Sequence, residues 1–206
     1  MATLDVLSEA ESLAAVNASA TTATLTNLVT AVSQQLDKLC GPVVVRTITS
    51  ELHDGGRPTI LLRNLPVSSI TTVTEYDGTT GTTLTAETNA TKTTINYLHL
   101  GTAGEVASGR IVRRSNNADH VFPDGRRNVE VTYVAGRAAT TSAVAPKFKQ
   151  AAAMMLRNVW VSEQASGSET FGAFTDQAPN PLLGPGMLNK VAALLDGEML
   201  PGVALL

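Results

Sequence analysis

Residues 128–163 read NVEVTYVAGRAATTSAVAPKFKQAAAMMLRNVWVSE, and this stretch decides the fold of the chain. In its first part β-branched and aromatic residues alternate with polar ones, which is the period of a strand with one buried face. Gly136 can adopt the positive φ that ends the strand. Pro146 suits the first position of a helix, because its φ is already right and its missing N–H costs nothing there. The stretch therefore predicts a strand at 128–134, a short loop and a helix at 146–164.

The predicted helix at 146–164 carries more apolar surface than one neighbouring element could cover. Phe148, Met155 and Val159 lie on one face of the helix, and Met154 and Trp160 extend the apolar character around it. This distribution predicts contacts to more than one packing partner.

Two helices are expected before this stretch, at 5–16 and 22–40. In the second, leucine and valine residues recur at the three-and-four spacing of a single buried stripe. Thr21 or Thr22 can cap its start, and Gly41-Pro42 stops it. Cys40, the one cysteine of the chain, falls on the apolar stripe and is expected to be a small buried residue.

The apolar period changes to that of strands after residue 42. Stretches rich in β-branched residues predict strands at 43–45, 59–62, 70–76, 93–100, 109–113 and 128–134. Turn residues at 54–56, 77–78, 101–104 and 124–125 separate them. The threonine-rich segment 71–94 has few large apolar residues, which predicts exposed hairpins.

After the long helix the sequence predicts a glycine- and proline-rich loop at 165–186, a short helix at 187–195 and an apolar tail broken by Pro201-Gly202. The element order predicts an α+β fold. A small helical bundle, made of two N-terminal helices, one long central helix and one short C-terminal helix, carries an inserted antiparallel β-rich region and an extended C-terminal tail. The expected domains are 1–42 with 143–196, the insertion 43–142 and the tail 197–206.

Composition limits the possible partners. The 206 residues carry a net charge of −3, whereas a protein that grips nucleic acid needs a clustered field of lysine and arginine. No segment reaches the roughly 20 apolar residues of a membrane span. The start of the chain has no basic region followed by an apolar run, so synthesis without a signal peptide is expected.

The sequence contains no recognisable catalytic constellation. His53, His99 and His120 lie in separate predicted turns or strands without zinc-ligand spacing. Asp119, His120 and Asp124 are close in sequence, but the regular alternation of oxygen ligands in a calcium loop is absent. Serine-hydrolase and phosphate-binding loop motifs are also absent. We therefore expect a non-enzymatic protein with no cofactor and no metal; a small hydrolase that uses Asp119 and His120 is an alternative.

One cluster of charge stands out around the last strands of the insertion. It consists of Arg110, Arg113, Arg114, Arg126, Arg127 and Arg137. Arginines of this density could contact an acidic protein surface or phosphates, or they could be solvated and ion-paired surface charges. Between the first two partners the acidic protein is favoured, because the chain as a whole is acidic.

Four segments carry a resemblance to a known family. They are LDKLCG at 36–41, VEVTYVAGRA at 129–138, VAPKFKQA at 144–151 and LPGVALL at 200–206. Together with the element order they resemble the head–tail connector (adaptor, or head completion) proteins of long-tailed bacteriophages. The helical frame makes up about half of the chain, and the β-rich insertion is larger than in the smallest members of the family.

The resemblance implies a structural protein of the virion neck, between capsid and tail, that is synthesised and assembled in the host cytoplasm. It implies a homo-oligomeric ring of about twelve subunits beneath the portal protein, closed by a heterologous contact. The ring would extend the DNA channel, let DNA pass without sequence-specific binding, and bind a stopper or tail-terminator protein. No membrane partner is implied. The alternative within virions is a tail-terminator, tail-tube or decoration protein.

Three surfaces follow from the implied role. The tail would bind the portal as an extended peptide through Leu200, Pro201, Gly202, Val203, Ala204, Leu205 and Leu206. Apolar residues of the long helix would contact neighbouring subunits: Phe148, Met154, Met155, Val159 and Trp160. The arginines Arg110, Arg113, Arg114, Arg126 and Arg127 would form a charged interface.

Overall fold

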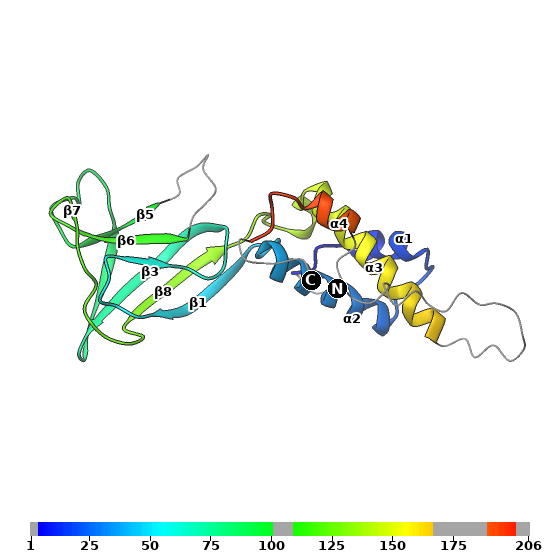
Figure 1. Cartoon of the computed structure of the whole chain (residues 1–206), viewed down its shortest axis with the longest axis horizontal. Coiled ribbons are helices and arrows are strands. Elements are labelled where there is room, and N and C mark those ends of the chain that lie inside the picture. The colour runs from blue at the N-terminus through cyan, green and yellow to red at the C-terminus, as the bar shows by residue number, and fades with distance from the viewer. Residues whose placement is uncertain (1–3, 101–108, 167–188, 201–206) are drawn as a thin grey trace, which may run out of the picture. The chain divides into compact units, whose positions relative to one another are not determined.

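The computed structural model describes residues 4–100, 109–166 and 189–200, and it has the predicted α+β class (Figure 1). The predicted loop at 165–186 and the turn at 101–104 lie largely or wholly outside the described residues. Two compact units form: one from Val45–Arg137, and the other from the residues on either side of that segment.

The first unit is helical and consists of α1 (Glu9–Val16), α2 (Ala23–Cys40), α3 (Pro146–Ser166) and α4 (Asn189–Leu194). Ser8 and Glu11 form a capping box at the start of α1, and the Thr22 side chain accepts from the backbone N of Leu25 at the start of α2. α3 begins at Pro146, as predicted. Both α1 and α2 pack against α3 (Figure 1).

The apolar stripe of α2 and one side of α3 form a shared core in the helical unit. Cys40 is fully buried in this core, as expected from the sequence. The core includes Val6, Leu7, Leu25, Val29, Leu36, Cys40, Val43, Phe148, Ala151, Ala152, Leu156, Val191 and Leu195. No helix of the described residues is long and apolar enough to cross a membrane.

The second unit is a sheet with the strand order β1-β8-β3-β4-β5-β6-β2, and β7 pairs with β6. The strands are β1 (Arg46–His53), β2 (Thr59–Leu61), β3 (Val67–Asp77), β4 (Thr80–Ala86), β5 (Asn96–Leu100), β6 (Arg110–Ser115), β7 (Ala118–Asp119) and β8 (Val129–Ala135). Neighbours are antiparallel except β4 and β5, which are parallel. The last strand in sequence, β8, lies between β1 and β3.

A single core lies within the sheet unit and draws on strands from both halves of this order. The sheet therefore folds over on itself. In β8 the residues Val129, Val131, Tyr133 and Ala135 are buried and alternate with half-buried ones, as predicted. The β3–β4 hairpin turns at Gly78-Thr79 and is mostly exposed, as expected of the threonine-rich segment.

Strand prediction was wrong at the start of the insertion. Residues 43–45 form only an isolated bridge between Val44 and Ala138, and the strand begins at Arg46. β1 escaped prediction because its polar sequence has no regular alternation: Ser50 has a φ of 54° and the pairing register with β8 shifts between Ile48 and Glu51.

Candidate functional site

The long helix α3 places its predicted interface residues in two different environments. Phe148 is 2% exposed and Met155 is 5% exposed, and both belong to the core of the helical unit. Both were predicted to contact a neighbouring subunit, and within the subunit their side chains already belong to the core between α3 and the other helices. Met154, Val159 and Trp160 are only partly buried. These three residues therefore keep part of their apolar surface accessible.

Beside the exposed part of Met154 the structure has a groove between α1 and α3, with a volume of about 780 Å³. Small apolar side chains line it, including Ala14, Ala15 and Ala153. Lys149 Nζ lies 2.7 Å from Glu11 Oε1 at its rim. A groove of this kind accepts an apolar side chain of another chain and offers a charged pair beside it. The sequence signal that could have found it is the small residues on both helices.

The described part of the predicted portal-binding tail ends at Leu200. Its backbone N donates to Leu39 O at 2.9 Å, and Glu198 pairs with Lys147. These contacts bring the tail to the end of α2. Residues 201–206 lie outside the described residues, so their role in portal binding stays a prediction.

Arg113, which was predicted to belong to a charged interface, has its partners within the subunit. It is 7% exposed, and its guanidinium forms two hydrogen bonds with Glu75, Nε to Oε2 at 2.6 Å and Nη2 to Oε1 at 2.8 Å. Its Nη1 lies 2.8 Å from His120 Nδ1. Such a bidentate pair satisfies the fork of an arginine within the subunit. Arg113 is therefore part of the interior of the sheet unit.

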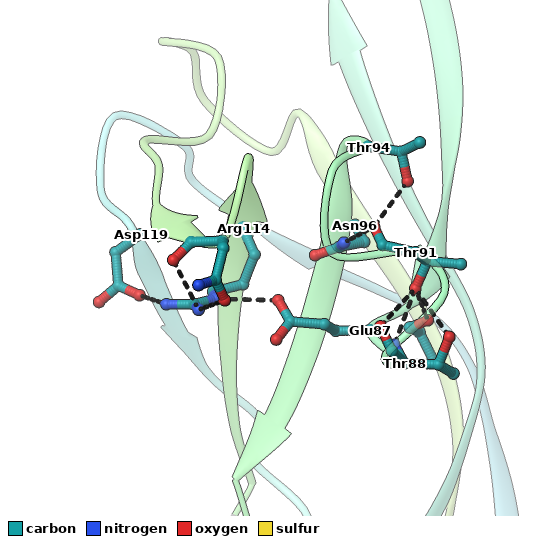
Figure 2. Close-up of polar contacts among 9 residues, drawn as sticks. Glu87, Thr88, Thr91, Thr94, Asn96, Arg114 and Asp119 are labelled. Carbon is teal, nitrogen blue, oxygen red and sulfur yellow. Dashed lines mark hydrogen bonds and ion pairs between the residues drawn. The ribbon is translucent and has the colours of Figure 1, made fainter.

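Arg114 also has its partners within the sheet unit (Figure 2). Its Nε donates to Glu87 Oε2 at 2.9 Å, its Nη1 to Asp119, and its Nη2 to Asn117 O at 3.1 Å. Hydrogen bonds to Asp119 and Glu87 raise the pKa of Arg114 above its ordinary value. Arg114 thereby joins β7 to the end of β4.

A compact threonine loop follows Glu87 (Figure 2). The Thr91 hydroxyl accepts from the backbone N of Thr88 at 2.7 Å and donates to Ala86 O. Asn96, which is fully buried, donates from Nδ2 to Thr91 O at 2.6 Å. The local hydrogen bonds explain how a segment with few large apolar residues is ordered.

The remaining predicted arginines, Arg110, Arg126 and Arg127, are exposed. Arg110 begins β6, and the other two lie in the loop before β8. Of the five predicted residues, these three are the ones that can reach a partner.

A buried polar network, which no local sequence pattern indicates, surrounds Glu51, which is 8% exposed. Tyr133 Oη donates to Glu51 Oε2 at 2.6 Å and accepts from Asn64 N at 3.1 Å; Arg63 N donates to Glu51 Oε1 at 3.0 Å. Burial, together with the hydrogen bond to Glu51, raises the pKa of Tyr133 from 10.0 to about 12. The network joins β1, β8 and the turn before β3.

Replacing Tyr133 with phenylalanine is expected to lower the free energy of unfolding by about 1–3 kcal/mol, because the buried Glu51 loses a donor. The neutral phenol stabilises the fold fully below pH 10.0, and this stabilisation is lost as the pH rises towards 12. Urea unfolding at a series of pH values should show a larger loss in the parent than in Tyr133→Phe, which keeps Tyr76 and Tyr97, whose pKa values are also raised. Tyr76→Phe is the control, since Tyr76 is half-buried and its hydroxyl lies 3.2 Å from Glu130. Equal pH profiles for parent and Tyr133→Phe would contradict the prediction.

The three histidines do not come together in the structure. His120 is exposed beside Arg113, and His99 is half-buried on β5. His53 was expected in an exposed turn but lies in β1, with Nε2 2.8 Å from Glu51 Oε1; burial lowers its pKa. Across residues 4–100, 109–166 and 189–200, no three His, Cys, Asp or Glu side chains are placed to hold a metal ion.

No protein-family model matches the chain, and no curated protein matches it in sequence. Among solved structures it is similar to a chain from the neck of an empty gene transfer agent (GTA) particle computed with C6 symmetry. The two chains share 18% of their residues, and the match covers 96% of this chain and 92% of the other with a TM-score of 0.50. At this identity the similarity shows a shared fold.

Proposed function

We propose that this protein is a structural component of the neck of a phage-like particle, a head-to-tail connector that forms a ring beneath the portal. The observation that carries the proposal is the fold, which matches a neck chain over 96% of the present chain. The match includes both units. Since one fold can serve different functions, the surfaces of the subunit have to support the role as well.

Surface properties of the helical unit support ring formation. A ring closed by rotation needs two different surfaces on each subunit, one for each neighbour. The groove between α1 and α3 is one such surface. Val161 is 49% exposed and Trp160 is partly buried. Because they follow Arg157 by four and three residues, they continue the groove side of α3 by one turn. We propose that the groove and these two side chains together form one surface that contacts an adjacent subunit.

The remaining partners are proposed from the role of a connector. The tail at 200–206 would bind the portal, and the opposite side of the ring would bind a stopper or tail-terminator protein. A net charge of −3 suits a channel through which DNA passes, because strong phosphate contacts would oppose its movement.

Native mass spectrometry of the purified protein, alone and with purified portal, tests the proposal. We expect a closed ring on the portal; six and twelve copies both satisfy the sixfold symmetry with which the neck of the GTA particle was computed. Negative-stain imaging of the same samples identifies the alternative. Long tubes with no binding to portal would indicate a tail-tube protein and overturn the connector assignment.

Removing residues 201–206 is expected to weaken portal binding by about tenfold or more, because each aliphatic side chain buried in a portal groove contributes about 1.5–3 kcal/mol. The subunit should stay folded, since α2 and α3 share an extensive core. Surface plasmon resonance on immobilised portal measures the affinity, and circular dichroism checks the fold. The matched control replaces 201–206 with a Gly-Ser segment of equal length, which should bind as weakly as the truncated protein. Unchanged affinity in either variant would show that the tail does not bind the portal.

A further inference from the structure

Two loops at one end of the sheet unit are joined into a single structure, which we call the double loop and define as residues 54–58 and 121–128. Gly55 N donates to Gly125 O at 3.0 Å, and Gly56 N donates to Phe122 O at 3.2 Å. In the other direction, Phe122 N donates to Arg57 O at 3.0 Å. Segments that are about 70 residues apart in sequence thus behave as one element.

Asn128 holds the double loop together through its side chain. Its Oδ1 accepts from Gly55 N at 2.8 Å, and its Nδ2 donates to Pro123 O at 2.7 Å and to Tyr76 O at 3.2 Å. A Cβ on Gly55 would lie 1.9 Å from Pro123 O, so only glycine fits there. Gly56 has a φ of 76°, which also favours glycine. The double loop is therefore a rigid support for the side chains that it carries.

Three exposed arginines extend from this support: Arg57, Arg126 and Arg127. Within the described part of the chain, none of their guanidinium groups has a hydrogen bond or an ion pair. Arg127 has a φ of 54°, and its backbone N donates to Asp54 Oδ1 at 2.8 Å, which holds this conformation. The carboxylate of Asp54 thus binds the loop backbone, while the guanidinium groups stay available.

An exposed apolar residue completes the surface. Val121 is 48% exposed and directly precedes Phe122, which is 1% exposed and anchors the loop in the core. Arginine next to an apolar side chain is typical of protein interfaces. A phosphate-binding surface would not need the valine, and Asp54 and Asp124 on the same element reduce its net positive charge.

We propose that the double loop is a docking surface for an acidic face of another protein. The guanidinium groups of Arg57, Arg126 and Arg127 match carboxylates in bidentate geometry, and Val121 supplies an apolar contact beside them. The rigid backbone lowers the entropy lost on binding. The inference deepens the proposed neck function, since the partner is then another protein of the neck.

The first test measures binding of a fluorescent poly-glutamate peptide and of a DNA duplex of equal charge by fluorescence anisotropy. The full-length protein should bind the peptide more tightly than the duplex. R126E/R127E should weaken peptide binding by about tenfold or more. The matched control is R110E/K190E, which changes the net charge equally at two exposed residues elsewhere and should change the affinity much less. Tighter binding of the duplex, or equal loss in both variants, would overturn the proposal.

The second test uses assembled particles and separates this inference from the neck function. A photo-crosslinking amino acid at Val121 should crosslink to an acidic segment of another particle protein. The same group at Leu61, which is 67% exposed on β2, should not give that product. The protein could be present in particles but crosslink only to DNA, or give equal products from both positions. Either result overturns the docking surface and leaves the neck function standing. If the protein is absent from particles, the neck function is overturned. The docking surface is then tested only by the peptide-binding measurement.

Discussion

Phe148→Ala is expected to lower the free energy of unfolding of the isolated subunit by about 3–5 kcal/mol, the range for removing a buried phenylalanine ring. Phe148 is 2% exposed and belongs to the same core as Leu25, Val29 and Leu156. Its loss leaves a cavity on the side of α3 that packs on the other helices, and dense packing prevents full collapse around it. Urea unfolding followed by far-ultraviolet circular dichroism measures the effect on the helices.

The control for this variant lies on the same helix. Val161 is 49% exposed, and Val161→Ala should change the free energy of unfolding by no more than about 0.5 kcal/mol. If Val161 contacts a neighbouring subunit, as proposed, its substitution should weaken the ring instead. A Phe148→Ala subunit as stable as the parent, combined with loss of the ring, would show that Phe148 lies at a subunit contact and would contradict its assignment to the core.

Arg113→Ala is expected to lower the free energy of unfolding of the sheet unit by about 3–5 kcal/mol, because it leaves the carboxylate of Glu75 buried without its partner. Glu75 is 5% exposed, and both of its oxygens accept from Arg113. The unfolding transition can be followed by hydrogen exchange of amides in β3 and β6, which reports on this unit separately from the helical one.

Two further variants identify the cause of that effect. Arg110→Ala removes an exposed arginine from the same strand and should cost less than about 0.5 kcal/mol. The double variant Glu75→Leu with Arg113→Met replaces the ion pair with apolar side chains, and should recover most of the lost stability, because buried pairs are often replaceable in this way. A double variant that is less stable than Arg113→Ala would contradict this expectation. It would show that the ion pair of Arg113 and Glu75 stabilises the fold more than the apolar pair that replaces it.

The helical frame was predictable because its signals are local. The three-and-four spacing in α2, the Thr22 cap and Pro146 at the start of α3 each depend on residues within a few positions of one another. The strand of β8 was equally clear, since its alternation is regular. In contrast, β1 has a bulge and depends for its pairing on a strand about 80 residues later, so no local pattern shows it.

The candidate surfaces were less predictable, because exposure depends on distant partners. Arg113 and Arg126 are the same residue type in a similar local sequence, yet only Arg113 meets Glu75, which lies 38 residues away. Helical periodicity showed that Phe148 and Met154 are on different sides of α3 but not which side the other helices cover. The double loop could not be predicted from local sequence, because it depends on the hydrogen bond between Asn128 and Gly55, which are 73 positions apart.

The position of β8 between β1 and β3 has a consequence for synthesis on the ribosome. Both β1 and β3 pair with β8, so each presents an open edge until residue 135 has left the exit tunnel. Contacts of such sequence separation form slowly, and open edges pair readily with other chains. A nascent chain that stalls before Val129 therefore leaves β1 without its partner and one edge of β3 open, and the sheet unit completes its fold only after nearly all of the segment inserted between α2 and α3 has been translated.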